Sequence, residues 1–334
     1  LNTVGVGVAD NGFQVVKKAS GAEGAAAKKF SFRYTCTLPD NTTTKSGQIT
    51  DVPGDETPVA SPEEFPVGTK CKVTEDTAGA GIDGYTLDPA GHDTQSVTIG
   101  RVSAPTVTAT FTNTYTRDTG RFSVKKVVEG ATFDGAANTF NVRYDCTPAS
   151  PSVHLTDEQK AGSLTLTGNG TAVTSPSLPF GTSCTIKEAD GSAQRAGYAV
   201  ATAYTADQVT VGTATPSPEV TVTNTYTLNK GTFSVKKVVE GATFDGADNK
   251  FTVRYDCTHN SVTLTNEQKA GSLTLTGNGT AVTSPSLPFG TSCTIKENDD
   301  SAQRAGYAVA TAYTAGQVTV GTATPSPEVT VTNK

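Results

Sequence analysis

The residues of this sequence whose types and spacing suit a reaction are a lysine, a glutamate and an asparagine that recur together three times. The sets are Lys17, Glu75 and Asn113, then Lys126, Glu188 and Asn224, and then Lys237, Glu297 and Asn333. In each set the lysine stands near the start of a repeated segment and the asparagine near its end. We therefore interpret each set as a chemical link within one segment, and not as an active site for a passing substrate.

The lysines face an apolar interior if their segments are β-strands, because alternate residues of a strand point to the same side. Lys126 lies in phase with Phe122 and Val124, whereas Lys125 falls on the opposite face. The first repeat has Val16 where the second has Lys125, so only the inward lysine is present in all three repeats. The glutamates and the asparagines are likewise in phase with apolar neighbours.

Three polar side chains in an apolar core are costly unless they satisfy one another. Burial disfavours the charged form of an amine and of a carboxyl group alike. A neutral lysine amine can then attack the carboxamide carbon of asparagine, while the glutamate polarises the carbonyl and carries protons to the departing ammonia. The product is an intramolecular isopeptide bond. The alternative is a buried Lys–Glu pair with the asparagine in a terminal turn, although such pairs stabilise a fold only weakly.

The segments around these sets are copies of one another. Residues 124–136 return unchanged at 235–247, and residues 162–188 return at 271–297, while the first copy has diverged. A period of about 110 residues is too long for a solenoid unit and is typical of independent domains in series. We predict three domains, at residues 1–116, 117–228 and 229–334.

The composition favours short β-strands. Segments such as 107–112 alternate apolar residues with threonine, which is typical of half-buried strands. The pairs Asn169-Gly170 and Asn278-Gly279 are typical of hairpin turns. Only residues 156–160 suggest a helix, and that helix would have a single turn. We therefore predict an all-β chain of three tandem Ig-like β-sandwich domains in a head-to-tail rod.

The six cysteines fall two to a repeat. A metal site is not favoured, because no two cysteines are closely spaced and His92, His154 and His259 occupy non-equivalent positions. Free buried cysteines are the other alternative. Paired cysteines in small β domains, with only 7% aromatic residues to build a core, favour disulfides in an oxidising environment. The predicted pairs are Cys36–Cys71, Cys146–Cys184 and Cys257–Cys293.

Charge and motifs exclude several classes of function. The net charge of −6 is mild and no basic stripe is present, so we expect no nucleic-acid partner. No apolar run is long enough to span a membrane, and no metal, dinucleotide or serine-nucleophile motif occurs. We expect no cofactor and no enzyme activity beyond the single-turnover formation of the isopeptide bonds. The first residue is not methionine and the chain stops one residue after Asn333, which suggests a piece of a longer secreted protein.

The sequence resembles the Cna B-type, or prealbumin-like, repeat domains of Gram-positive surface proteins and pilins. The resemblance rests on the lysine of the opening Phe-x-Val-x-Lys segment, a glutamate ahead of a Gly-Tyr pair such as Gly197-Tyr198, and the closing Val-Thr-Asn-Thr segment. The layout is also similar to cysteine-paired repeats of unknown function in large actinobacterial cell-wall proteins. The resemblance implies isopeptide bonds Lys17–Asn113, Lys126–Asn224 and Lys237–Asn333, with Glu75, Glu188 and Glu297 as their catalysts.

Function is expected to follow from this architecture. Short linkers at 116–120 and 227–231 predict a stiff, monomeric rod that serves as the stalk of a cell-wall-attached adhesin. We expect its anchor to lie outside this sequence and flanking domains to bind a host protein or glycan. One alternative is a ligand-binding module in the first repeat, with its acidic segment 51–64 at the contact. Another is the shaft of a pilus.

Overall fold

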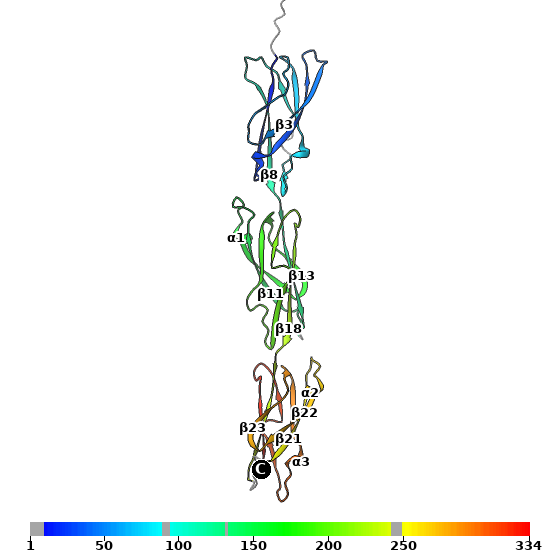
Figure 1. The fold of residues 1–334 in the computed structure, drawn as a ribbon, viewed down its shortest axis with the longest axis vertical. Helices are drawn as coiled ribbons and strands as arrows, with labels where there is room; N and C mark the ends of the chain where they lie inside the picture. The colour runs from blue at the N-terminus through cyan, green and yellow to red at the C-terminus, as the bar shows by residue number, and fades with distance from the viewer. Residues whose placement is uncertain (1–9, 89–93, 131–132, 242–248) are drawn as a thin grey trace, which may run out of the picture.

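The computed structural model describes residues 10–88, 94–130, 133–241 and 249–334. Three β-sandwiches, called domains 1, 2 and 3, follow one another along the long axis of an extended molecule (Figure 1). Each sandwich is built from two four-stranded sheets. The all-β fold predicted from the alternation of apolar residues and threonine is confirmed.

The strands and short helices of each domain have the following bounds. Domain 1 contains β1 (Phe13–Ser20), η1 (Ala25–Ala27), β2 (Lys29–Thr37), β3 (Thr44–Pro53), β4 (Val59–Ala60), β5 (Lys70–Glu75), η2 (Thr77–Gly79), β6 (Tyr85–Leu87), β7 (Gln95–Thr98) and β8 (Val107–Arg117). Domain 2 contains β9 (Thr119–Gly120), β10 (Ser123–Glu129), β11 (Thr139–Thr147), α1 (Asp157–Lys160), β12 (Ala161–Thr167), β13 (Asn169–Thr174), β14 (Leu178–Pro179), β15 (Ser183–Glu188), β16 (Tyr198–Tyr204), β17 (Gln208–Thr210) and β18 (Glu219–Leu228). Domain 3 contains β19 (Lys230–Gly231), β20 (Ser234–Val239), β21 (Lys250–Thr258), α2 (Asn266–Lys269), β22 (Ala270–Thr276), β23 (Asn278–Thr283), β24 (Leu287–Pro288), β25 (Ser292–Glu297), α3 (Asp299–Ala302), β26 (Thr311–Tyr313), β27 (Gln317–Thr319) and β28 (Glu328–Asn333).

The two sheets of a domain are formed by different strands, and neighbouring strands in a sheet are often not consecutive in the sequence. In domain 2 one sheet has the order β13-β10-β18-β16, and the other has the order β12-β11-β15-β17. Domains 1 and 3 repeat this arrangement, with β4-β1-β8-β6 facing β3-β2-β5-β7 and β23-β20-β28-β26 facing β22-β21-β25-β27. The early strand β10 and the last strand β18 lie side by side and parallel at the centre of their sheet. The beginning and the end of each domain are therefore neighbours.

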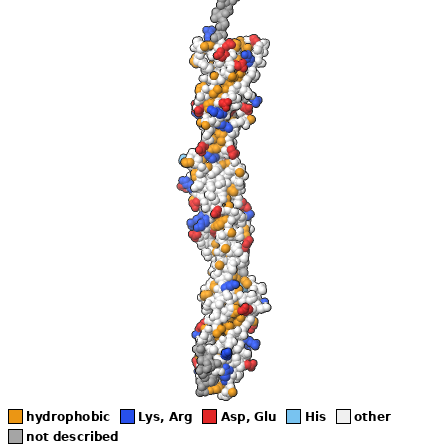
Figure 2. All heavy atoms as spheres, viewed as in Figure 1, with side chains coloured by type: hydrophobic (Ala, Val, Ile, Leu, Met, Phe, Trp, Pro, Cys, Tyr) orange, Lys and Arg blue, Asp and Glu red, His pale blue; other side chains and the backbone are white. Residues whose placement is uncertain are grey.

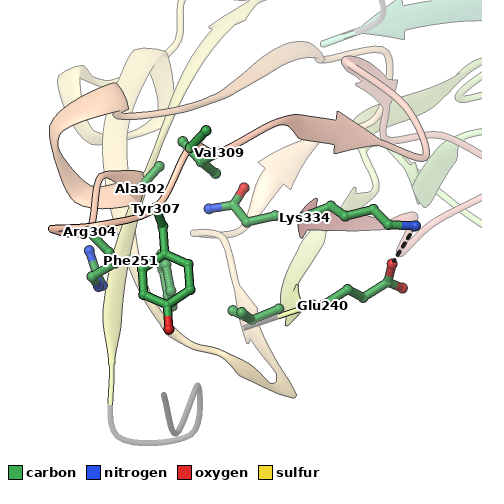
Figure 3. Close-up of a pocket in the computed structure, with 11 residues that line it drawn as sticks. Glu240, Phe251, Ala302, Arg304, Tyr307, Val309 and Lys334 are labelled. Carbon is green, nitrogen blue, oxygen red and sulfur yellow. Dashed lines mark ion pairs between the residues drawn. The ribbon is translucent and has the colours of Figure 1, made fainter. Parts of the chain in front are cut away.

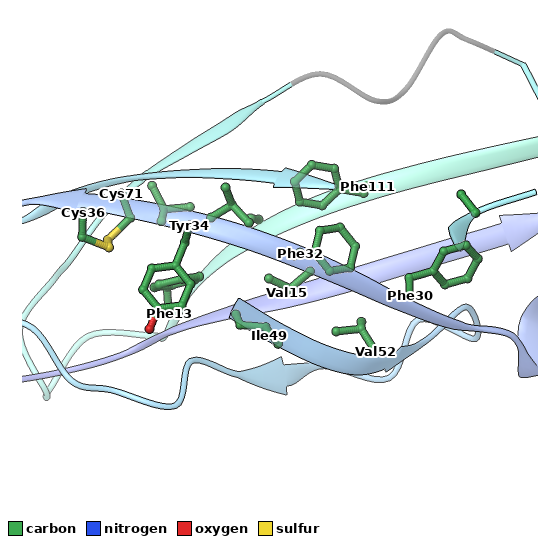
Figure 4. Close-up of a cluster of buried hydrophobic side chains, with 14 of the residues drawn as sticks. Phe13, Val15, Phe30, Phe32, Tyr34, Cys36, Ile49, Val52, Cys71 and Phe111 are labelled. Atoms are coloured by element: carbon green, nitrogen blue, oxygen red, sulfur yellow. A yellow bond between two sulfur atoms is a disulfide. The ribbon is translucent and has the colours of Figure 1, made fainter. Parts of the chain in front are cut away.

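The core of each domain is formed by the inward-facing residues of both sheets. In domain 1 Phe32 and Phe111 meet with ring centroids 4.7 Å apart, and Phe13 meets Tyr34 edge to face at 5.5 Å (Figure 4). These side chains are at most 2% exposed. Burial of one such side chain stabilises the fold by roughly 1.5–3 kcal/mol. In domains 2 and 3 valines take the places of Phe32 and Phe111, so those cores hold fewer aromatic rings.

The single helical turn expected at residues 156–160 is present as α1. Thr156 accepts a hydrogen bond from the backbone N–H of Gln159, and the Gln159 side chain accepts one from the backbone N–H of Thr156. This capping box satisfies donors that a helix terminus otherwise leaves unpaired. Two acidic residues in the first turn and a lysine in the last favour the turn further.

Backbone hydrogen bonds fix the joints between domains. The N–H of Asp118 donates to the carbonyl of Gly84 in domain 1 (2.9 Å), and the carbonyl of Asp118 accepts from the N–H of Phe180 in domain 2 (2.8 Å). Asn229 makes the equivalent two bonds between domains 2 and 3, at 2.9 and 2.8 Å. The linker strands β9 and β19 also pair with β14 and β24 of the domain that follows. Each linker is thus incorporated into the fold and has little slack.

Charged side chains are dispersed over the rod. On the face drawn in Figure 2, lysine and arginine side chains are interspersed with aspartate and glutamate in all three domains. Ion pairs such as Lys125–Glu219 (2.6 Å) and Lys236–Glu328 (2.6 Å) use some of these charges within a domain. No broad patch of one sign dominates this face.

A glycine lies directly opposite a buried tyrosine in each domain, and this pairing gives a test of the packing. Gly162 on β12 pairs with Tyr144 on β11, and a Cβ atom at Gly162 would collide with the tyrosine hydroxyl. That hydroxyl cannot easily move, because it donates a 2.9 Å hydrogen bond to the carbonyl of Glu158. We expect Gly162→Ala to lower the free energy of opening of β11 and β12 by about 1–3 kcal/mol.

Hydrogen exchange with peptide-level mass spectrometry measures this change in the intact chain. The matching peptides of domain 3 provide an internal reference. Gly212→Ala is the matched control, because a Cβ atom there meets no atom within 4 Å, and we expect a change within about 1 kcal/mol. Unchanged exchange in β11 for Gly162→Ala would contradict the packing described above.

Candidate functional site

The strand register brings each lysine close to its asparagine. In domain 2 Lys126 is paired with Val222, and Asn224 lies two positions further along the neighbouring parallel strand, on the same face of the sheet. Domain 1 has the same offset between Lys17 and Asn113, and domain 3 has it between Lys237 and Asn333. The two residues come from opposite ends of the domain sequence, yet they are neighbours in one sheet.

The glutamate reaches them from the facing sheet. Glu188 ends β15 and is paired with Val142 on β11, so its side chain crosses the interior between the two sheets. Glu75 and Glu297 occupy the same place on β5 and β25. All nine side chains of the three sets are at most 6% exposed. The structure therefore brings together every lysine, glutamate and asparagine predicted from the sequence.

The carboxylate bridges the amine and the carboxamide in domains 1 and 2. In domain 2 Lys126 Nζ is 3.1 Å from Glu188 Oε2, and Asn224 Nδ2 donates to Glu188 Oε1 at 3.2 Å. In domain 1 the corresponding distances are 2.6 Å and 2.8 Å. One glutamate thus contacts both nitrogen atoms between which a proton must move in an amide exchange.

Domain 3 has a different arrangement of the same groups. Lys237 Nζ lies 2.9 Å and 3.0 Å from the two carboxylate oxygens of Glu297. Asn333 Nδ2 is buried and has no hydrogen-bond partner within the described residues. The lysine is therefore held as in the other domains, while the carboxamide nitrogen is not engaged.

An apolar surrounding changes the acidity of the lysines. Burial lowers the pKa of Lys126 from 10.5 to about 8, and the negative charge and hydrogen bond of Glu188 oppose this shift. Burial likewise lowers the pKa of Lys17 and of Lys237. Each amine also lies over an aromatic ring, as Lys126 does over Phe140 with Nζ 5.1 Å from the ring centroid. The fraction of neutral, nucleophilic amine near neutral pH is therefore far larger than for a solvated lysine.

A threonine hydroxyl contacts the carbonyl oxygen of the asparagine in two domains. Thr202 Oγ1 donates to Asn224 Oδ1 at 2.8 Å, and Thr311 Oγ1 donates to Asn333 Oδ1 at 3.0 Å. Sequence reasoning missed these residues. A signal was present, because both threonines stand four positions after the tyrosine of a Gly-Tyr pair.

A pocket opens beside the third set, at the end of domain 3. Its lining includes Phe251, Ala302, Arg304 and Tyr307, and Glu240 and Lys334 form an ion pair of 3.8 Å at its side (Figure 3). In domain 2 the equivalent space holds the side chain of Tyr226, which is 2% exposed.

Each domain also contains one disulfide. The bonds are Cys36–Cys71, Cys146–Cys184 and Cys257–Cys293. In every case the two cysteines are directly opposite each other on adjacent strands, as Cys146 on β11 is opposite Cys184 on β15. Each disulfide therefore lies in the sheet that carries the glutamate (Figure 4 shows the first).

No other chemistry is suggested by the described part of the chain. Within it, no group of three or more histidine, cysteine, aspartate or glutamate residues is arranged to hold a metal ion. Its helices are all too short or too polar to cross a membrane. His92, which entered the metal argument from the sequence, lies outside the described residues.

Solved structures with a similar fold come from several bacteria. The TIE protein of Bacillus anthracis is 14% identical with a TM-score of 0.38, and the match covers 97% of this chain and 51% of that one. The major pilin T3.2 of Streptococcus pyogenes is 14% identical with a TM-score of 0.30 over 66% of this chain and 99% of that one. An adhesin of Mobiluncus mulieris, described as containing intramolecular disulfide, isopeptide and ester bond cross-links, is 10% identical with a TM-score of 0.25, over 65% and 98%.

These likenesses concern the fold alone, and this chain spans about half the length of the TIE protein. No curated protein matches the sequence. A family model described as "Domain of unknown function (DUF5979)" matches residues 13–116, 122–227 and 233–334, which is nearly the whole chain. The chain therefore belongs to the DUF5979 family, of which it contains three tandem copies.

Proposed function

We propose that the chain is a stalk segment of a bacterial cell-surface protein, in which an isopeptide bond joins the lysine and the asparagine of each domain. One observation carries this proposal. In all three domains a buried lysine and a buried asparagine occupy the same register on adjacent parallel strands, with a glutamate directed at them from the facing sheet.

The proposed reaction is an amide exchange, in which the lysine nitrogen replaces the carboxamide nitrogen of asparagine. Lys126 Nζ attacks Asn224 Cγ, a new Nζ–Cγ bond forms, and the Cγ–Nδ2 bond breaks. Glu188 takes a proton from the attacking nitrogen and returns it to the leaving nitrogen, which departs as ammonia. The glutamate contacts both nitrogens in domain 2, as this transfer requires.

The position of the bond suits a stalk. Tension applied to the ends of the chain enters domain 2 through β10 and leaves through β18, and these two strands are the ones that the bond joins. The residues between Lys126 and Asn224, which include the disulfide, then carry no tension. The joints at Asp118 and Asn229 keep the domains in line, so the assembly extends a distal group away from a surface.

The proposed location is extracellular, on a protein attached to the cell wall by a segment outside this sequence. Disulfides form and persist in oxidising environments, which supports this location. Recognition of a host protein or glycan is assigned to other domains of the same protein.

The acidic segment 51–64 gives less support to the alternative of a ligand-binding first domain. Glu56 already pairs with Lys18 at 3.0 Å, and Glu63 pairs with Lys45 at 3.5 Å. Tyr34 also donates a hydrogen bond to Glu63, at 3.3 Å. These acidic groups are used within the domain, which favours the stalk.

The first prediction for this function concerns mass. Three isopeptide bonds should make the reduced, denatured chain lighter than its sequence by about 51 Da, since each bond releases one ammonia of about 17 Da. We expect Glu188→Gln to restore one ammonia equivalent, and peptide mapping should place it in domain 2. Lys125→Ala is the matched control, because this neighbouring lysine faces outward to Glu219 and should leave the loss complete. A mass equal to that of the sequence would refute the proposal.

The second prediction concerns pH. With the pKa of Lys126 at about 8, the neutral fraction of its amine rises from about a tenth at pH 7 to about nine tenths at pH 9. Chain recovered unfolded from inclusion bodies and refolded by dilution should therefore lose ammonia in domain 2 faster as the pH rises to about 9, and no faster above it. A rate that keeps rising tenfold per unit toward pH 10.5 would show a lysine of ordinary acidity.

The third prediction concerns force. Pulling the native chain by its ends should give no domain-sized steps, with or without reductant. Lys126→Ala should give one step on the order of 300 Å, less the part that the disulfide retains, at about 3.3–3.6 Å per residue. Reduction of Cys146–Cys184, whose cysteines are 38 residues apart, should lengthen that step by about 130 Å. Domain-sized steps in the native chain would contradict the proposed bonds.

A further inference from the structure

The two ends of the reacting carboxamide are held by different groups. In domain 2 the nitrogen of Asn224 donates to Glu188, whereas its oxygen accepts from the hydroxyl of Thr202. Sequence reasoning gave the glutamate two tasks, polarisation of the carbonyl and transfer of protons. The geometry leaves the glutamate on the nitrogen side and places a separate donor on the oxygen.

The position of this donor is set by strand pairing. Thr202 lies on the edge strand β16 directly opposite Asn224 on β18, so both side chains point to the same face of the sheet. Thr311 on β26 is opposite Asn333 on β28 in the same way. The donor is thus held by the backbone of the neighbouring strand and does not depend on a mobile loop.

A hydrogen-bond donor at the carbonyl oxygen Oδ1 lowers the activation free energy of the reaction. When the amine attacks Asn224 Cγ, the carbonyl electron pair moves to Oδ1, which becomes negatively charged. A hydrogen bond that is already aimed at this oxygen is stronger in the transition state than in the ground state, so it accelerates the reaction.

We propose that Thr202 and Thr311 are catalytic residues of isopeptide formation, each of which stabilises the charge that develops on the carbonyl oxygen of its asparagine. This inference rests on the function proposed above. Glu188 moves the proton from Lys126 Nζ to Asn224 Nδ2, the Cγ–Nδ2 bond breaks, ammonia leaves, and the carbonyl re-forms. The threonine donates a hydrogen bond throughout and neither gains nor loses a proton.

Domain 1 provides a comparison within the same chain. Asn113 Oδ1 is buried and has no hydrogen-bond partner among the described residues. The residue four positions after Tyr85, where the other repeats have threonine, is Pro89, which has no hydroxyl and lies outside the described residues. We therefore expect domain 1 to form its bond more slowly than domain 2.

The test compares the full-length chain with its Thr202→Val and Thr202→Ser variants. Each chain is refolded from the unfolded state, and the loss of ammonia from every domain is followed over time by peptide mapping. We expect Thr202→Val to slow the reaction of domain 2 by about tenfold to a hundredfold, because the residue is exposed at the sheet edge and a fully enclosed donor contributes more. Thr202→Ser should keep most of the rate, and domain 3 should be unaffected.

The possible outcomes separate the two proposals. If domain 2 of the unmodified chain loses no ammonia, the proposed function itself fails. If it reacts and Thr202→Val reacts equally fast, the threonine has no catalytic part. An equal loss of rate in Thr202→Ser and Thr202→Val also overturns the inference, because the effect would then not come from the hydroxyl.

The contribution of Thr202 to the stability of domain 2 is measured in a chain that cannot form the bond. Hydrogen exchange of domain 2 is compared between Lys126→Ala and Lys126→Ala combined with Thr202→Val. Equal exchange, together with the slower reaction described above, supports a catalytic role. Destabilisation that matches the loss of rate overturns that role, since the rate would then follow the stability of the fold.

Discussion

A lysine amine in the apolar interior of a β-sandwich is the interaction on which the rest of each domain depends. Lys126 is fully buried, and a charge in this position must be paired or neutralised. Pairing with Glu188 compensates only in part, because desolvation of both groups offsets their attraction. Conversion of the amine into an amide removes the charge altogether. The register of β10 and β18 and the inward direction of the Glu188 side chain at the end of β15 bring the three groups together.

The two sheets of a domain have separate structural tasks. One sheet contains the parallel strands that begin and end the domain, and it carries both partners of the proposed bond. The other sheet holds the disulfide between β11 and β15 and supplies the glutamate from the end of β15. A disulfide four residues from Glu188 limits the movement of that strand, which keeps the carboxylate in place between the amine and the carboxamide.

Much of this arrangement is encoded in local pattern, and some of it is not. The period of two in the sequence is sufficient to predict an all-β fold and to place Lys126, Glu188 and Asn224 on inward faces, because alternation is a local property of a strand. Thr202 could not be recognised in that way, since threonine is common throughout these strands for its β propensity alone. Its spacing from the Gly-Tyr pair marks the position, but only the pairing of β16 with β18 places it opposite Asn224, and such pairing is fixed by contacts between distant segments. The backbone bonds of Asp118 are equally invisible in the sequence, because they involve no side chain.

The joint between domains has a consequence for how such a chain can change in length. Asp118 and Asn229 connect their domains through backbone N–H and carbonyl groups, which every residue except proline provides. A new copy of the repeat inserted by duplication would meet a carbonyl equivalent to that of Gly84 in the domain before it. It would meet an N–H equivalent to that of Phe180 in the domain after it. At the first joint two side-chain hydrogen bonds add to these backbone bonds, from Arg117 to the carbonyl of Phe180 at 3.0 Å and from Thr213 to Asp83 at 3.3 Å. Long identical segments in repeats 2 and 3 are in keeping with growth by this route, and the reach of the protein can be adjusted one repeat at a time.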